Sequence, residues 1–334
     1  MIKNPTLSMT VLGALLCLSG NSGATEASGP AAQQSLDDAW WTGPILAAGA
    51  GTLPQGHALI EPYVYDVIRY GRYDNDGDER NAARAHSYGS LTYILYGVTD
   101  RFTAGLIPTF GYNDVGNGRD SSAIQMGDIS VQGQYRLTQF RQGSPIPTLS
   151  LVVQQTLPTG KYDRLGENVN DGFGSGAYTT TLALYSQYYA WMPNGRILRS
   201  RFNVSYALSS RADIEDVSVY GTNAGFRGTA RPGDVITINS AWEYSITREW
   251  VFAVDLMYQH DASTTLEGAE TDPATGRMEN VEERFDSAWR FGIAPALEYN
   301  FSSRVGVIAG ARWFAAGRNT SATITPVAAI NMVF

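Results

Sequence analysis

The sequence predicts an all-β protein, a transmembrane antiparallel up-and-down β-barrel of about twelve strands of the bacterial outer-membrane type. Three observations lead to this prediction: apolar and polar residues alternate, short and long connections alternate, and aromatic residues gather near the expected strand ends. Residues 236–260 show the alternation of apolar and polar residues, with Ile238 and Trp242 on one parity and Asn239 and Glu243 on the other. Successive side chains of a strand point to opposite faces, so this segment predicts a hairpin with one apolar and one polar face.

The N-terminal residues show the three-part pattern of a secretory signal peptide. Lys3 precedes an apolar run over residues 9–18, and mainly small residues follow as far as Ala27. We expect residues 1–27 to be cleaved, because the apolar run is too short to anchor the chain in a bilayer. Cys17 is the only cysteine of the chain, and the bulky leucines before it disfavour a lipoprotein.

Residues 28–56 precede the first expected strand. They comprise a polar, alanine-rich part and an apolar-aromatic stretch, WWTGPIL, at residues 40–46. Two placements remain open for this segment: it lies in the periplasm, or it folds into the lumen as a plug. No later segment reaches the apolar length of a transmembrane helix.

Residues 57–334 are predicted to form the barrel. Short connections are expected at residues 99–100, 138–145, 192–195, 247–249 and 300–303. Longer, polar connections are expected at residues 69–83, 113–123, 158–175, 210–233, 261–284 and, more briefly, 315–320. The two kinds alternate strictly, which is typical of outer-membrane barrels with tight periplasmic turns and long outer loops. Both termini are therefore expected on the periplasmic side.

A soluble barrel would also show alternation, so further features must separate the two classes. Charged residues recur on the polar parity of several strands, where a soluble barrel would need an apolar filling. Aromatic residues such as Trp250, Tyr258 and Trp289 stand near strand ends, where membrane interfaces favour amphipathic rings. The chain ends at Phe334 on an amphipathic strand, which resembles the signal read by the outer-membrane assembly machinery. These features favour the membrane barrel.

Charged residues on the polar parity are the candidates for lining the lumen. The predicted set is Arg136, Arg199, Arg201, Glu243, Asp255, Asp286, Arg290, Glu298 and Arg312. In one interpretation they set the selectivity and size of a pore. In the other they pair with one another and hold together a filled barrel, because about twelve strands falls between small filled barrels and wide porins.

Composition limits the partners and cofactors. The formal net charge is -8 and no stretch of Lys and Arg stands out, which argues against a nucleic-acid partner. We find neither a phosphate-binding glycine loop nor a metal-ligand cluster, and we expect no cofactor. Residues 74–79, DNDGDE, lack the EF-hand spacing; they solubilise a loop or hold a divalent ion loosely. The expected partners are outer-membrane lipid and lipopolysaccharide, the barrel assembly machinery and a small-molecule solute.

Two other functions are weighed against a channel. An outer-membrane hydrolase would need a histidine near a serine and an acid, and His260 with Ser263 and Asp261 is the candidate group. The signature expected around such a nucleophile is not visible, so we do not expect an enzyme. A structural or adhesive barrel would use its long acidic loops as the working surface.

Several short motifs carry a family resemblance. They are TGPIL at residues 42–46, TLPQGH at 52–57, EPY at 61–63, GDISV at 127–131, YRL at 135–137 and LPTG at 157–160. Over residues 41–334 the chain resembles the outer-membrane barrels of the "MetA-pathway of phenol degradation" family. The resemblance implies a porin-like channel in the outer membrane of a Gram-negative bacterium for passive uptake of small, often aromatic or hydrophobic, molecules. It carries over no catalytic or ligand-binding residue.

Overall fold

The computed structural model describes residues 31–116, 118–271 and 277–334, so the expected signal peptide at residues 1–27 lies outside the described residues. The strands are β1 (Ala58–Tyr73), β2 (Glu79–Thr99), β3 (Phe102–Ile107), β4 (Thr109–Asp114), β5 (Gln125–Met126), β6 (Ile129–Thr138), β7 (Thr148–Leu157), β8 (Thr179–Trp191), β9 (Ile197–Ser209), β10 (Ala212–Glu215), β11 (Arg227–Arg231), β12 (Val235–Ser245), β13 (Trp250–Asp261), β14 (Thr264–Thr271), β15 (Met278–Phe285), β16 (Ala288–Asn300), β17 (Val305–Arg318) and β18 (Thr320–Val333). Two 3-10 turns, η1 (Leu36–Asp38) and η2 (Val169–Asp171), complete the secondary structure of these ranges. Within them, no helix is long and apolar enough to cross a membrane.

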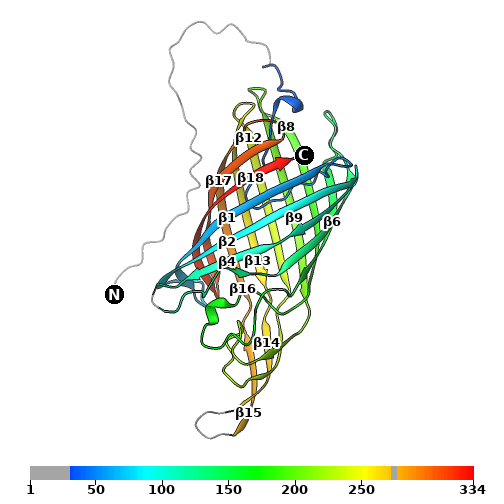
Figure 1. Ribbon diagram of the computed structural model, residues 1–334. Coiled ribbons are helices and arrows are strands. Elements are labelled where there is room, and N and C mark those ends of the chain that lie inside the picture. Colours follow the sequence, from blue (N-terminus) through cyan, green and yellow to red (C-terminus); the bar gives the residue numbers. More distant parts are fainter. Residues whose placement is uncertain (1–30, 117, 272–276) are drawn as a thin grey trace, which may run out of the picture.

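The main sheet closes into a twelve-stranded antiparallel barrel, which confirms the predicted fold class. Consecutive strands of the barrel pair with each other, and β1 closes the ring by pairing with both β18 and β2. β3 and β4 both pair with β2 and form one span that is interrupted at Pro108, which lacks the N–H that the ladder needs. The tilted strands enclose a lumen (Figure 1).

The two ends of the barrel differ. Tight turns, the start of β1 and the end of β18 lie at one end, which we call the turn end, and the longer connections lie at the other, the loop end (Figure 1). Two predicted loops are shorter than expected. β1 and β2 continue through most of residues 69–83, and Asn319 alone joins β17 to β18, with a φ of 52° in the left-handed region that asparagine tolerates. The extended strands pair beyond the expected span, because backbone pairing does not require an apolar face.

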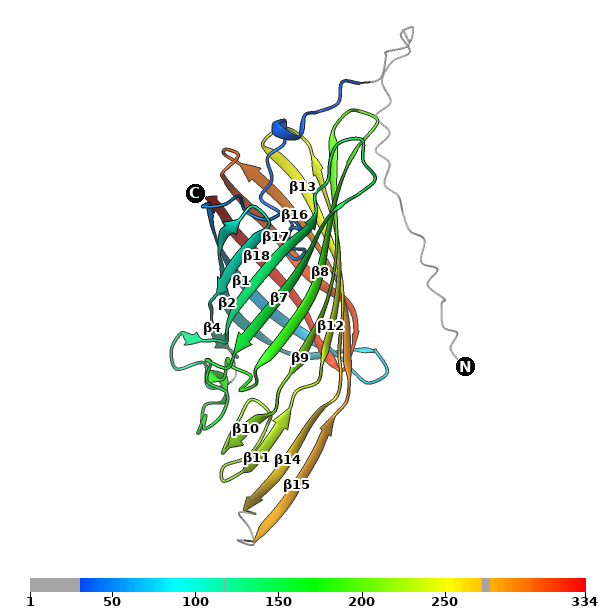
Figure 2. The same cartoon turned by 90° about the vertical axis from the view of Figure 1, so that its right-hand side faces the viewer.

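The loop end carries a second sheet, in the order β10-β11-β14-β15 (Figure 2). These strands lie within residues 210–233 and 261–285. Both segments connect barrel strands, as predicted, but the sequence predicted no strands in them. The physical reason is a small apolar core outside the barrel, formed by buried Ile214, Phe226 and Leu266 together with alanines. The apolar residues that build it are few and widely spaced, so the polar composition of the segments concealed them.

The barrel wall has an apolar outer face and a polar inner face. Large apolar side chains are exposed on the outside, among them Val131, Tyr135, Leu151, Val153, Leu182, Leu184, Phe252 and Leu297. On the opposite parity, polar and charged side chains are buried inside, among them Gln134, Ser150, Arg199, Glu243, Asp255 and Glu298. This arrangement is the reverse of a soluble barrel and fits a barrel whose exterior meets hydrocarbon.

Glycines let aromatic rings lie flat against the wall. A Cβ at Gly89 would overlap the ring of Tyr65 on the neighbouring strand, and a Cβ at Gly111 would overlap the ring of Phe173. We expect Gly89→Ala to destabilise the barrel by about 1–3 kcal/mol, because the ring must leave its position in a packed wall. Unfolding in urea, followed by tryptophan fluorescence, measures the change. Gly51→Ala is the control, since a Cβ there meets nothing within 4 Å; an equal effect of both changes would contradict the packing argument.

Candidate functional site

The N-terminal residues 39–53, which we call the lumen segment, form an arch inside the barrel. The arch begins at the turn end, where the Trp40 N–H donates to the Arg248 carbonyl in the turn between β12 and β13. Ala47 and Ala50 are fully buried, and the arch returns to the turn end where the Thr52 hydroxyl donates to the Asp100 carbonyl. Figure 2 shows this chain descending into the barrel from the end that carries η1. Within the stretch of residues 28–56, residues 39–53 lie in the lumen, and the described residues 31–38, with η1, contact the tight turns at the turn end.

Inward-facing carboxylates accept the backbone N–H groups of the lumen segment. Asp255 on β13 accepts from the N–H groups of Ile45 at 3.0 Å and Ala47 at 2.9 Å. Glu298 on β16 accepts from the Thr42 N–H at 2.7 Å. The segment belongs to no sheet, so its buried donors need side-chain partners, and the barrel wall supplies them.

Amide, hydroxyl and guanidinium groups from other strands bind the carbonyls of the same segment. Arg201 donates to the Ala47 carbonyl at 2.7 Å, and Asn203 donates to the Ala48 carbonyl at 2.9 Å. Gln134 donates to the carbonyls of Gly49 and Gly51 at 3.1 and 2.9 Å, and Ser150 donates to the Ala50 carbonyl at 2.6 Å. The barrel therefore holds both sides of the arch through side chains that alternate inward along its strands.

A buried ionic cluster lies beside the arch. Glu243 on β12 accepts hydrogen bonds from both Arg199 and Arg201 on β9, with the Nε atoms at 2.7 and 2.9 Å from Oε2. Glu243 is 0% exposed and the arginines 6% and 7%. Trp41 of the lumen segment covers Arg199, with 4.3 Å from the guanidinium carbon to the ring centroid. The strand register places Glu243 opposite Arg199, so antiparallel pairing brings these charges together.

Three cavities follow one another along the lumen. The mouth cavity, at the turn end, has a volume of about 330 Å³ and is lined by Trp41, Arg136 and Tyr189 among others. A central cavity of about 240 Å³ lies between the lumen segment and the wall that includes Tyr63 and Tyr93. The vestibule cavity, toward the loop end, measures about 440 Å³ and is lined by residues that include Arg69, Arg290 and Arg312.

The predicted lumen residues fall into three groups. Arg199, Arg201, Glu243, Asp255 and Glu298 lie together around the lumen segment. Arg136 borders the mouth cavity, and Arg290 and Arg312 border the vestibule cavity. Asp286 lies apart from all of these, exposed in the link between β15 and β16.

Sequence reasoning missed several members of the site. Gln134, Ser150 and Asn203 hold the arch, and Glu61 accepts from the Asn331 amide at 3.2 Å beside the central cavity. Their position on the inward parity of their strands was the available signal. The predicted set contained only charged residues, so it left out the three uncharged ones, and it also left out the carboxyl group of Glu61.

Phe334 takes part in closing the barrel. Its N–H donates to the Ala58 carbonyl at 2.8 Å, and its own carbonyl accepts from the Ala58 N–H at 3.1 Å. Its side chain is 62% exposed on the outside. The terminal residue therefore presents an aromatic ring at the seam where the last strand meets the first.

The candidate hydrolase residues make separate contacts. His260 pairs with Ile236 and Trp289 and shares their outward parity. The Ser263 hydroxyl instead accepts from Arg284 at 3.4 Å. Within the described ranges no hydrogen bond joins the two residues.

The acidic stretch at residues 74–79 forms an ordered turn at the loop end. Asp74 accepts from the N–H groups of Asp76 and Asp78, and from Arg80 at 2.8 Å. The hydrogen bond from Arg80 and those from the backbone lower the pKa of Asp74. The carboxylate is used to build the turn, and no group of three or more His, Cys, Asp or Glu that could hold a metal occurs in the described part of the chain.

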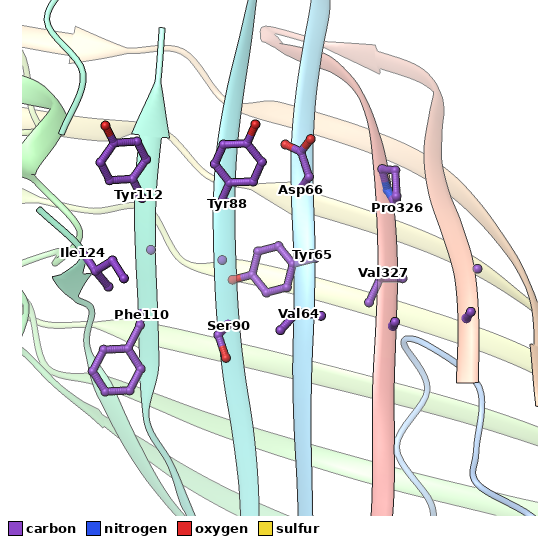
Figure 3. Close-up of a pocket in the computed structure, with 15 residues that line it drawn as sticks. Val64, Tyr65, Asp66, Tyr88, Ser90, Phe110, Tyr112, Ile124, Pro326 and Val327 are labelled. Carbon is purple, nitrogen blue, oxygen red and sulfur yellow. The ribbon is translucent and has the colours of Figure 1, made fainter. Parts of the chain in front are cut away.

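The outer face has an apolar groove of about 840 Å³. It crosses β4, β2, β1 and β18, and its sides include Val64, Tyr88 and Phe110 (Figure 3). Beside it, Asp66 and His86 form a hydrogen bond of 2.8 Å between Oδ2 and Nδ1. The outward parity of Val64 and Phe110, both paired with Ser90, places this groove outside the lumen.

Comparison with known proteins gives one family and several related folds. The model of the family described as "MetA-pathway of phenol degradation" matches residues 63–325. The COG4313 outer membrane channel from Pseudomonas putida F1 has 15% sequence identity and a TM-score of 0.65, over 85% of this chain and 98% of that chain. The NanC porin has 11% identity and a TM-score of 0.43, over 81% and 98% of the two chains. The P. putida toluene transporter TodX has 13% identity and a TM-score of 0.37, over 89% and 95%. No curated protein matches the chain.

Proposed function

We propose that this chain, which belongs to the "MetA-pathway of phenol degradation" family, is a passive channel for small molecules in the outer membrane of a Gram-negative bacterium. The observation that carries the proposal is the succession of three cavities through a closed barrel whose outer face is apolar. Diffusion down a gradient needs a passage and no energy-coupling site.

The exterior supports an outer-membrane location. Exposed apolar side chains cover the strands, and the described strands close into a ring through β1, which pairs with both β2 and β18, as a strand-built wall in hydrocarbon requires. We propose that lipid and, in the outer leaflet, lipopolysaccharide contact this surface. Phe334, exposed at the seam, is proposed as the residue that the barrel assembly machinery reads.

The central cavity supports small aromatic or hydrophobic solutes. Tyr63 and Tyr93 lie edge to face with ring centroids 6.0 Å apart, and Tyr185 contributes a third ring to the lining. Such rings offer apolar contact area with a polar tip, which suits a solute with a ring and one polar group. The lumen segment narrows the passage at this level, so we propose that it restricts the size of the solute.

Permeation into liposomes tests the proposed function. Swelling of liposomes that contain the purified full-length mature barrel is measured against a panel of aromatic and aliphatic solutes, with protein-free liposomes as the reference. We expect faster swelling for small solutes, with a cut-off in size. Swelling at the protein-free rate for every solute would reject the channel and favour a structural or adhesive barrel, for which the second sheet at the loop end would be the working surface.

Charge at the mouth cavity should set ion selectivity. Arg136 is half-buried there, and the other residues that line the cavity are neutral. Arg136→Glu is expected to shift the reversal potential in a KCl gradient toward cations, because the change reverses the local field at a narrow entrance. Arg304→Glu, at an exposed turn of the same end, is the matched control. An identical shift in both variants would show that Arg136 does not border the ion path.

A further inference from the structure

We propose that the vestibule cavity is a binding site for the carboxylate of a small aromatic acid, held by Arg312 and Arg290 around the ring of Phe314. This inference rests on the proposed function for its biological meaning, since it names a solute class that the channel would take. The site itself is argued from the residues that line the cavity.

The first observation is an excess of positive charge. Arg69, Arg290 and Arg312 line the cavity, and none of its lining residues is Asp or Glu. Arg290 has one acidic partner, Asp261 on the neighbouring strand. Arg312 has no ion pair with any described residue; it donates only to the Thr325 hydroxyl, at 3.4 Å. A charge left without a counter-ion in a partly buried space attracts an anion.

The second observation is a set of unpaired donors on residues that line the same cavity. The Nε atoms of Arg290 and Arg312 and the hydroxyl of Thr323 are buried, and within the described ranges they have no hydrogen-bond partner. All three residues line the vestibule cavity. Buried donors are normally paired, so their concentration here points to an acceptor that completes the site. A carboxylate offers two oxygens that match the planar fork of a guanidinium.

The third observation is an aromatic platform between the charges. The guanidinium carbons of Arg312 and Arg290 lie 4.7 and 5.6 Å from the centroid of Phe314. Val67 and Ala85 add apolar lining, and the volume of about 440 Å³ suits a small molecule. Apolar walls with a few converging donors favour an amphipathic acid over a simple inorganic anion.

The site lies on the way in from the loop end. The connection between β7 and β8 reaches over the cavity, where the Asn113 side chain donates to the Asn170 carbonyl at 3.1 Å and Asn170 joins the lining. A solute that enters past the loops meets the vestibule cavity before the central cavity. Binding of an acid in the vestibule cavity would raise the local concentration of that acid at the entrance to the narrow part of the lumen.

Equilibrium binding to the purified full-length mature barrel in detergent tests the site, with benzoate, benzamide and acetate as probes in titration calorimetry. Benzoate is expected to bind more tightly than benzamide, which lacks the charge, and than acetate, which lacks the ring. Arg312→Gln should weaken benzoate binding at least about tenfold, the loss expected for one charge-assisted hydrogen bond. Arg304→Gln, at the opposite end of the barrel, should leave it unchanged.

Thr323→Val is a second, nearly isosteric variant that removes the unpaired hydroxyl, and it should weaken benzoate binding several-fold. It tests the site independently if Arg312→Gln does not fold. Equal affinity for benzoate and benzamide, or unchanged binding in the folded variants, would overturn the site. Benzoate binding without any permeation would keep the site and reject the channel. Permeation of benzoate and benzamide at equal rates, without saturable binding, would keep the channel and reject the site.

Discussion

Deletion of residues 31–53 is expected to raise the single-channel conductance several-fold. The lumen segment occupies the middle of the barrel and is held by hydrogen bonds to Asp255, Glu298 and Gln134. The strands pair with one another without it, so the wall should persist when the segment is removed. A barrel of twelve strands has room for water once its interior is cleared, since its width falls between filled barrels and porins.

The same deletion should make the channel cation-selective. Asp255 and Glu298 would lose the backbone N–H donors of the arch and face water as carboxylates. Their combined field in a narrow lumen favours cations. Reversal potentials in a KCl gradient, recorded with the conductance in planar bilayers, measure this change.

The control for this experiment is deletion of residues 31–38 alone, which removes η1 and leaves the arch in place. It should leave both the conductance and the selectivity close to those of the intact protein. If deletion of residues 31–53 also left the conductance unchanged while the barrel remained folded, the lumen segment would not be what narrows the passage.

Glu243→Gln is expected to give the largest loss of stability among single substitutions, about 3–5 kcal/mol of unfolding free energy. Glu243 is fully buried and is the carboxylate that both Arg199 and Arg201 contact. Its neutralisation leaves two nearly buried guanidinium groups facing each other without that counter-charge. Removal of one partner of a buried ionic cluster costs more than the cluster contributes, because the remaining charge stays desolvated.

Unfolding in urea, with the barrel reconstituted in lipid vesicles, measures this loss. Arg199→Gln should cost less than Glu243→Gln, because Glu243 keeps Arg201 as a partner. Glu267→Gln, at an exposed position on β14 outside the barrel, should change the unfolding free energy very little. Equal losses in all three variants would contradict the proposed role of Glu243 as the shared counter-charge.

The alternation of residues along each segment predicted strands with one apolar and one polar face. Ile238 and Trp242 stand on one parity and Asn239 and Glu243 on the other, and the pairing of β12 with β9 and β13 keeps those faces apart. The strict alternation of short and long connections predicted the meander. The second sheet could not be predicted in the same way, because Ile214 and Leu266 lie in separate strands, Phe226 directly precedes a third, and none of these strands shows a long apolar pattern.

The local pattern of residues thus indicated which face of each strand is apolar and which is polar, and where most of the tight turns lie. These properties follow from the geometry of a strand, in which each side chain points opposite to its neighbour whatever the rest of the chain does. Long-range contact established the rest. The carboxylate of Asp255 meets the N–H of Ala47 across 208 positions of sequence, and Arg290 and Arg312 share the ring of Phe314. Such partners meet only when the register of all twelve strands and the path of the lumen segment are set together. The reason is that the closed barrel determines which polar groups lie within hydrogen-bonding distance of one another.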